Sequence, residues 1–145
     1  MATGDVVVFD EALAKMLTGN WASTDSFWCA ICDNTATPAA ASGTPTLADF
    51  TQVGTAGTYV TGGLTLGAYS TLVSEAAGTV TFDSGTNPTW AQHASSDSDA
   101  WWGIIYNKTD TASDCLAFVE LGGPVNMKTG SLTITWSGTG VFTIA

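Results

Sequence analysis

Asp99-Ala-Trp-Trp-Gly-Ile-Ile-Tyr-Asn107 is the densest run of large apolar residues in the sequence. In an extended strand successive side chains point to opposite faces, and this run is apolar on both faces. Such a strand is normally covered twice, by a second sheet and by a loop or a neighbouring subunit. We therefore predict a central strand that ends at the turn residues 107–110. One face carries Trp102, Ile104 and Tyr106, and the other carries Trp101 and Ile105.

The composition around this strand is apolar and poor in charge. Of the 145 residues, 45% are hydrophobic and only 11% are charged, against about a quarter in ordinary globular domains. Thirteen acidic residues face three lysines and no arginine, which gives a formal net charge of −10. Such a chain cannot neutralise several phosphates, so we expect no binding to nucleic acid or to an anionic membrane surface.

The length suits one domain, and we predict a single domain over residues 1–145. Residues 1–10 lack the basic start and apolar core of a signal peptide, and no apolar run is long enough to span a bilayer. Three cysteines are an odd number and imply no disulfide framework. Synthesis in a reducing cytoplasm is the simplest interpretation.

A short helix is predicted near the N-terminus. Asp10 is placed to cap it, Gly19 to end it, and Glu11 and Lys15 to form an i, i+4 ion pair. Residues 1–20 thus form an arm and a helix over 10–17. Its expected role is to close one end of the core, and docking to a partner is the alternative.

The whole chain, with 99–107 included, predicts about nine short strands separated by turns, at the spacing of a sandwich or barrel. Leu132, Ile134 and Trp136 share the inward face of the cleanest one, and 141–144 is its expected hairpin partner. Residues 34–47 form a flexible loop, and 47–53 form a helical turn or a short edge strand. The fold predicted is an all-β antiparallel sandwich, jelly-roll-like, with one N-terminal helix. Besides 99–107, the expected strands cover 26–33, 69–74, 78–83, 89–92, 114–121, 131–136 and 141–144, together with 58–61 and 64–66 as two pieces joined at a turn or bulge. Residues 6–9 are a short strand or an extended arm.

Cys29-Ala-Ile-Cys32 has the spacing of a metal-ligand pair. On a strand, however, positions i and i+3 point to opposite faces and cannot share one ion. Only Cys115 and His93 remain as further ligands. We therefore interpret the cysteines as structural and predict neither a metal site nor a cofactor.

His93 has no Gly-x-Ser-x-Gly elbow and no fixed serine and carboxylate beside it. Paired carboxylates can hydrolyse a glycoside or bind calcium, but no complete calcium loop is present. We predict no catalytic residue and no enzyme activity, with hydrolysis through His93 as the weakest alternative. The loop acids considered are Asp83, Asp97, Asp99 and Asp110.

Six tryptophans could supply a platform on which sugars stack. Trp21 and Trp90 are the two that we expect to be freer, and a carbohydrate-binding module would depend on them. The other four lie in strongly apolar strands and are expected in the core: Trp28, Trp101, Trp102 and Trp136.

The order of the segments along the chain resembles that of a known protein family. Residues 8–19 and 24–32 place a short helix ending in glycine and a short acidic turn before an apolar strand. The segments 46–53, 57–66, 80–83, 89–90, 100–106, 116–122 and 130–144 follow in order. Together they resemble a family of small virion proteins of tailed bacteriophages. The chain departs from this pattern at Cys29 and Cys32, where branched aliphatic residues are typical, and in the long loop 34–46.

The resemblance implies a virion structural role. We expect a capsid decoration (cement) protein that binds the major capsid protein on the outer surface of the shell, as a trimer. A neck, tail or head-fibre position is the alternative within the virion. A carbohydrate-binding module for host attachment is the alternative from another class.

Overall fold

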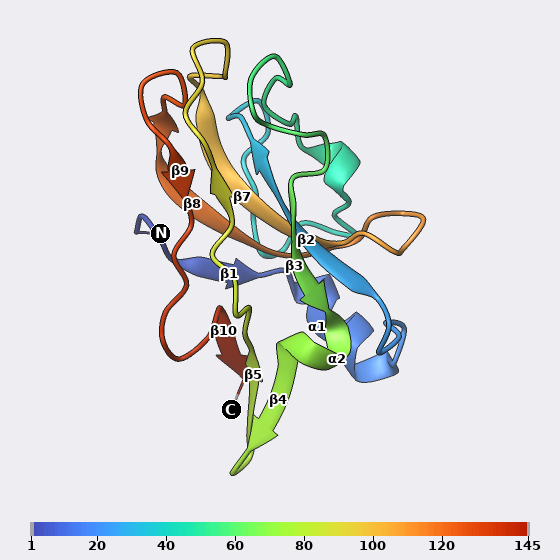
Figure 1. Ribbon diagram of the computed structural model, residues 1–145. Helices are drawn as coiled ribbons and strands as arrows, with labels where there is room; N and C mark the ends of the chain where they lie inside the picture. Colours follow the sequence, from blue (N-terminus) through green and yellow to red (C-terminus); the bar gives the residue numbers. More distant parts are fainter. Residues whose placement is uncertain (1, 145) are drawn as a thin grey trace.

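The computed structural model describes residues 2–144, and its centre is a five-stranded antiparallel sheet (Figure 1). β7 is the middle strand of the order β1-β8-β7-β2-β3, which confirms the prediction of a central strand there. It pairs with β2 from Trp102↔Cys32 to Asn107↔Phe27 and with β8 on its other side. The strands are β1 (Val6–Val8), β2 (Ser26–Cys32), β3 (Leu64–Ala68), β7 (Ala100–Asn107) and β8 (Cys115–Val125).

Both faces of β7 are covered, as its sequence predicts. On the face of Trp102 and Tyr106, Phe9 packs on Phe118 with ring centroids 5.0 Å apart, and Trp102 lies edge-on to Phe118 at 6.1 Å. The Tyr106 hydroxyl donates a hydrogen bond of 2.9 Å to the carbonyl oxygen of Gly62. The segment before α1 and the loop before β3 therefore cover this face.

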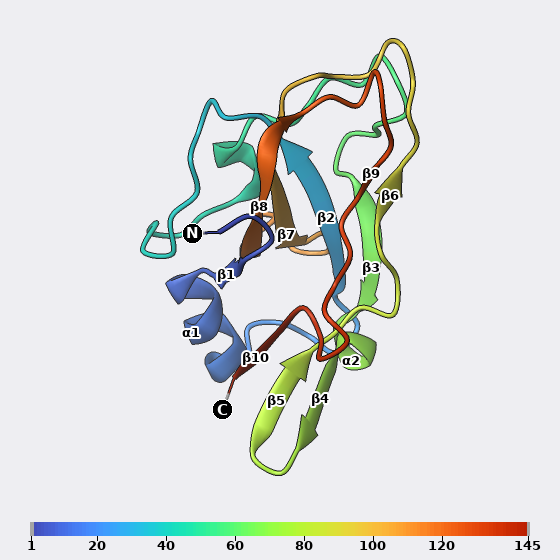
Figure 2. The ribbon, with the colours of Figure 1, turned by 90° about the vertical axis from the view of Figure 1, so that its left-hand side faces the viewer.

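The opposite face packs against a second layer made of two small sheets. The side chain of Ile134 lies close over Gly103, where a Cβ would come within 2.9 Å of it. Phe27 meets Phe82 of this layer with ring centroids 5.7 Å apart. The predicted all-β antiparallel sandwich with an N-terminal helix is confirmed (Figure 2). The small sheets are β6 (Thr89–Trp90) with β9 (Leu132–Thr133), and β10 (Phe142–Ile144) with β5 (Thr79–Phe82) and β4 (Val73–Ala76).

The predicted N-terminal helix is present as α1 (Asp10–Thr18). Its capping residue and the ion-pair partner of Lys15 differ from the prediction. Phe9 occupies the cap position without a side-chain cap bond, and Asp10 is the first helical residue. Lys15 forms its ion pair with Asp114, which lies in the loop before β8, because that partner is buried. Gly19 ends the helix with φ 70°, as predicted.

The predicted hairpin between 131–136 and 141–144 is wrong. Thr133 of β9 pairs with Thr89 of β6, and their hydroxyl oxygens lie 3.0 Å apart. After the turn at 137–140 the chain moves to the other small sheet, where β10 pairs with β5. Gly140 permits this change of direction because its φ of 102° suits glycine, and a Cβ there would lie 2.6 Å from Thr81.

Three other segments differ from or refine the sequence predictions. Residues 69–74 were expected as a strand, yet they form the short helix α2 (Tyr69–Leu72) and the start of β4. Residues 58–61 form an irregular segment that ends in a turn rather than a strand, with Tyr59 buried. The helical turn expected within 47–53 is the 3-10 helix η1 (Leu47–Asp49), held by a capping box between Thr46 and Asp49. Residues 34–45 carry no helix or strand, and their flexibility stays a prediction.

Trp136 lies half-buried, whereas Leu132 and Ile134 are buried as predicted. Its indole nitrogen donates 3.1 Å to the carbonyl oxygen of Thr86. We expect Trp136→Ala to lower the free energy of unfolding by about 1–2 kcal/mol, because part of the ring is already in water. Ile134→Ala, which empties core volume, should cost about 2–4 kcal/mol. Urea denaturation of both variants checks this order, and a larger loss for Trp136→Ala would contradict it.

Candidate interaction surface

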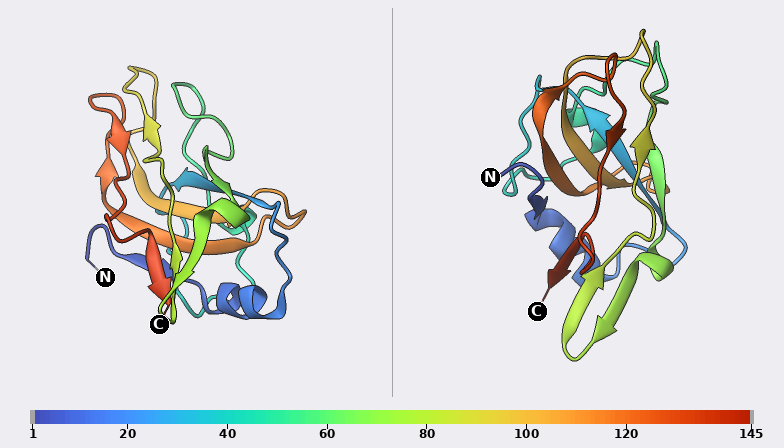
Figure 3. Two further views of the ribbon diagram at one scale, coloured as in Figure 1. Left: turned by 60° about the horizontal axis from the view of Figure 1, so that its bottom comes forward. Right: turned by 60° about the vertical axis from the view of Figure 1, so that its left-hand side comes forward.

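An apolar groove lies between helix α1 and the small sheet that ends in β10. Figure 2 and the right panel of Figure 3 show α1 and the β4–β5 hairpin on the two sides of β10 at one end of the molecule. The groove has a volume of about 350 Å³. Its lining residues are apolar or aromatic: Leu13, Met16, Leu17, Tyr69, Val80 and Ile144. Hereafter these six residues are the α1 groove.

The sheet wall of the groove arises from the register of its strands. Ile144, Val80 and Glu75 are direct partners across β10, β5 and β4 and therefore share one face. Two residues further along, Phe142 stacks on Phe82 at 5.1 Å, and Phe82 is buried in the core. The sheet extends past the core by one row of side chains, so Val80 and Ile144 stay 36% and 39% exposed.

The helix wall arises from a wide apolar stripe on α1. Ala12 faces the core and is fully buried, while Leu13 and Met16 lie beside it and are only half-covered. Leu17, in the last turn, is 89% exposed, which is the largest exposure of any large apolar residue described. A helix whose apolar face is wider than the core it covers leaves part of that face for another contact.

Two acidic residues, one on each wall, flank the α1 groove. Glu75 is the direct cross-strand neighbour of Val80, and Asp10 lies on the same helical face as Leu13 and Leu17. The groove is therefore apolar inside and negatively charged at its rim.

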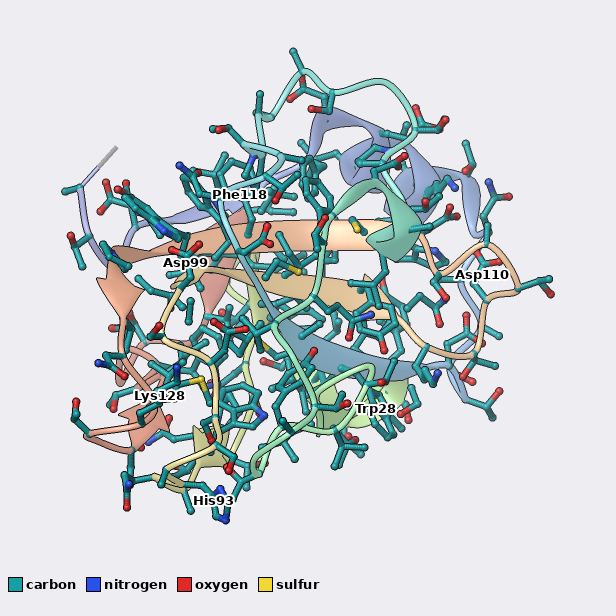
Figure 4. All side chains as sticks on the ribbon, turned by 90° about the horizontal axis from the view of Figure 1, so that it is seen from above. Trp28, His93, Asp99, Asp110, Phe118 and Lys128 are labelled. Atoms are coloured by element: carbon teal, nitrogen blue, oxygen red, sulfur yellow. The ribbon has the colours of Figure 1, made fainter. Side chains whose placement is uncertain are left out.

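The three lysines are directed elsewhere. Lys15 pairs with Asp114, and Lys108 lies 5.7 Å from the ring centre of Trp28. Lys128 lies near Asp97 at the end of the molecule that carries His93 (Figure 4). No lysine of the described chain neutralises the groove rim.

The cysteines lie as their spacing on a strand predicts. Cys29 pairs with Ile105 and Cys32 with Trp102, so their side chains are on opposite faces of β2. Both are buried free thiols, as is Cys115. Among residues 2–144 no group of three or more His, Cys, Asp or Glu side chains is placed to hold a metal ion.

Burial raises the pKa of Cys32 from 9.0 to about 12, and the nearby Asp33 adds to this shift. Burial raises the pKa of Cys29 and of Cys115 as well. The thiolate, and not the neutral thiol, is the nucleophilic form, so these side chains have low reactivity at neutral pH.

We expect all three thiols to resist labelling by iodoacetamide or a disulfide reagent at pH 8 and to react promptly in urea. The raised pKa of Cys32 also predicts stability that is complete below about pH 9 and lost as the pH rises toward about 12. Mass spectrometry after timed labelling checks the first expectation. Rapid modification of the folded protein would contradict the observed burial.

The other candidate residues are not brought together. Figure 4 shows His93, Asp99 and Asp110 at separate parts of the molecule. His93 accepts a hydrogen bond of 3.1 Å at Nδ1 from the Ser95 N–H, and Asp99 accepts one of 2.6 Å from the Trp101 indole. Asp83 is exposed next to β5.

Asp97 and Asp110 each stabilise a turn. Backbone N–H groups, first that of Gly54, hold the pKa of Asp97 below its usual value. A hydrogen bond with Asp114 lowers the pKa of Asp110, while burial raises the pKa of Asp114. These carboxylates therefore organise loops.

The prediction that Trp21 and Trp90 are the freer tryptophans is wrong. Trp21 and Trp90 are 6% and 2% exposed, and neither offers a ring to solvent. Trp21 packs edge-on against Phe27 at 5.1 Å, between α1 and β2. Trp102 is buried as expected, whereas Trp28 and Trp101 are half-buried. A sugar platform on Trp21 or Trp90 is therefore excluded by their burial.

The sequence of this chain gives no significant match to a protein-family model, to a curated protein or, as a structure, to a solved structure. Neither of the described helices is long and apolar enough to cross a membrane. The site must therefore be interpreted from its own geometry.

Proposed function

We propose that this protein is a structural component of a tailed-phage virion, and specifically a capsid decoration (cement) protein. It binds the outer surface of the major capsid shell as a trimer and connects neighbouring capsid subunits. The order of its segments resembles small virion proteins of this kind. Its all-β fold is compatible with that role, although the fold by itself assigns no function.

The observation that carries the proposal is the α1 groove. Leu17, Val80 and Ile144 expose large apolar side chains within one small region, and apolar patches of this kind mark interaction sites. The three cysteines are buried, and His93, Asp99 and Asp110 lie at separate parts of the molecule. A surface made for contact, without a cluster made for chemistry, favours a binding or structural protein over an enzyme.

The charge of the chain favours the outer surface of the shell. A formal net charge of −10 would repel DNA packaged inside a capsid. On the outside the same charge keeps the protein soluble before it attaches.

The test is the copy number of the protein in purified particles, measured by quantitative mass spectrometry relative to the major capsid protein. Decoration requires copies comparable in number to the capsid subunits. A copy number equal to the symmetry of a single ring would assign the protein to the neck, tail or a fibre instead. Absence from particles would reject a virion role, and binding on a glycan array would then favour a host-attachment module.

A further inference from the structure

The α1 groove is held in shape before anything binds to it. Its helix wall is anchored by the Lys15–Asp114 ion pair and by the packing of Phe9 on Phe118. Its sheet wall is anchored by the stack of Phe82 on Phe142. A preformed groove loses little conformational entropy when it is filled, so its apolar surface contributes efficiently to binding.

The rim determines the charge of the occupant. Glu75 and Asp10 flank the apolar lining, and the three lysines lie at other places. A second copy of this chain would bring another net charge of −10 to this rim, with only three lysines in the whole chain. A segment with positive charges beside its apolar anchors complements the groove in both respects.

We infer that the α1 groove receives an apolar segment flanked by lysine or arginine residues of another protein. The identification of that protein as the major capsid protein rests on the proposed function. The apolar side chains enter between Leu17 and Val80, and the flanking cations meet Glu75 and Asp10. The apolar contacts set the lifetime of the complex, while the charges mainly accelerate its formation.

The experiment uses the whole protein, immobilised, and a library of short random peptides displayed on phage. Peptides bound by the wild type are selected, and those that also bind Leu17→Asp are removed. We expect the enriched peptides to combine two or more large apolar residues with flanking lysine or arginine. Enrichment of acidic peptides, of peptides without apolar residues, or of none would overturn the inference.

Two pairs of variants then locate the site with a synthetic copy of an enriched peptide. Leu17→Asp should weaken binding by about 10-fold or more, because it replaces a buried apolar contact with a charge. Its control is Val60→Asp, since Val60 is also strongly exposed, at 63%, but lies in the loop before β3. The control should bind like the wild type, and equal losses in both variants would overturn the inference.

Glu75→Lys should weaken binding by about fivefold, and most of that loss should be a slower association. Its control is Asp99→Lys, which also removes a surface carboxylate that accepts one hydrogen bond. In the wild type, association should slow between about 0.05 and 0.5 M NaCl while dissociation changes little. An unchanged association rate in Glu75→Lys would contradict the inference that the occupant carries positive charges beside its apolar residues.

Sedimentation of the wild type and of Leu17→Asp identifies the competing occupant. Self-association that is lost in Leu17→Asp would show that a second copy fills the groove, which overturns the inference. The inference and the proposed function fail separately. Particles that carry many copies and retain Leu17→Asp at wild-type levels reject the groove alone, whereas peptide binding without any copies in particles rejects the virion role alone.

Discussion

Gly63→Ala is expected to lower the free energy of unfolding by about 3–5 kcal/mol, which is a large part of the stability of a small domain. Gly63 enters β3 with φ 80°, a conformation that costs any other residue about 1–2 kcal/mol. A Cβ at this position would lie 2.7 Å from the Cα of Ala30 and closer still to the carbonyl oxygen of Cys29. Both atoms belong to the backbone of β2, so the clash cannot be relieved by a side-chain rotation.

Gly78→Ala is the matched control for this prediction. Gly78 has nearly the same φ, 83°, but no atom lies within 4 Å of the position its Cβ would take. The free energy of unfolding of Gly78→Ala should fall by only about 1–2 kcal/mol, which is the cost of placing alanine at this positive φ. Urea unfolding of the two variants separates backbone strain from close packing. Equal losses would show that β3 does not approach β2 as closely as the structure has it.

The sequence predicts the centre of this fold better than its ends. The apolar run 99–107 is long and apolar on both faces, so it can occupy only a covered, central strand, and this is confirmed. The small sheets depend on strands of two to four residues, whose alternation fits more than one partner. For this reason the expected hairpin of 131–136 with 141–144 is replaced by the pairs β6–β9 and β5–β10.

Local patterns also fail where a distant residue competes with a near one. Glu11 is the nearest acid to Lys15 on the helix, but Asp114 offers a buried partner. Trp21 and Trp90 lie outside the strongly apolar strands, which is why the sequence predicts that they are freer than the other four tryptophans. The fold places Trp21 over Phe27, a contact that no local pattern contains.

The α1 groove was not predicted, although part of its signal is present in the sequence. Alternation indicates that Val80 and Phe82 share a face, and that Phe142 and Ile144 do so as well. It does not indicate which end of the strand lies over the core. Phe82 is 1% exposed and Val80 36%, so one apolar pattern serves both the core and a surface.

Particles that lack this protein are expected to assemble with normal shape and to package DNA, yet to release it at a lower temperature or under osmotic shock. A single domain of this size can offer about 800 Å² to the shell, which is a standard patch for a specific interface. If three copies join, their contacts act together, and avidity can exceed the affinity of one site by about 10²–10⁴. Release of DNA is followed by fluorescence of an intercalating dye during heating.

A trimer bound across several capsid subunits must dissociate before those subunits separate. Loss of the protein is therefore expected to affect the stability of the finished shell and not its assembly. Bound protein therefore raises the barrier to rupture without taking part in assembly. Purified wild type and Val60→Asp should restore resistance when added to deficient particles, whereas Leu17→Asp should restore little. Failure of assembly without the protein, or equal endurance without it, would contradict the cement role and favour a neck, tail or host-binding position.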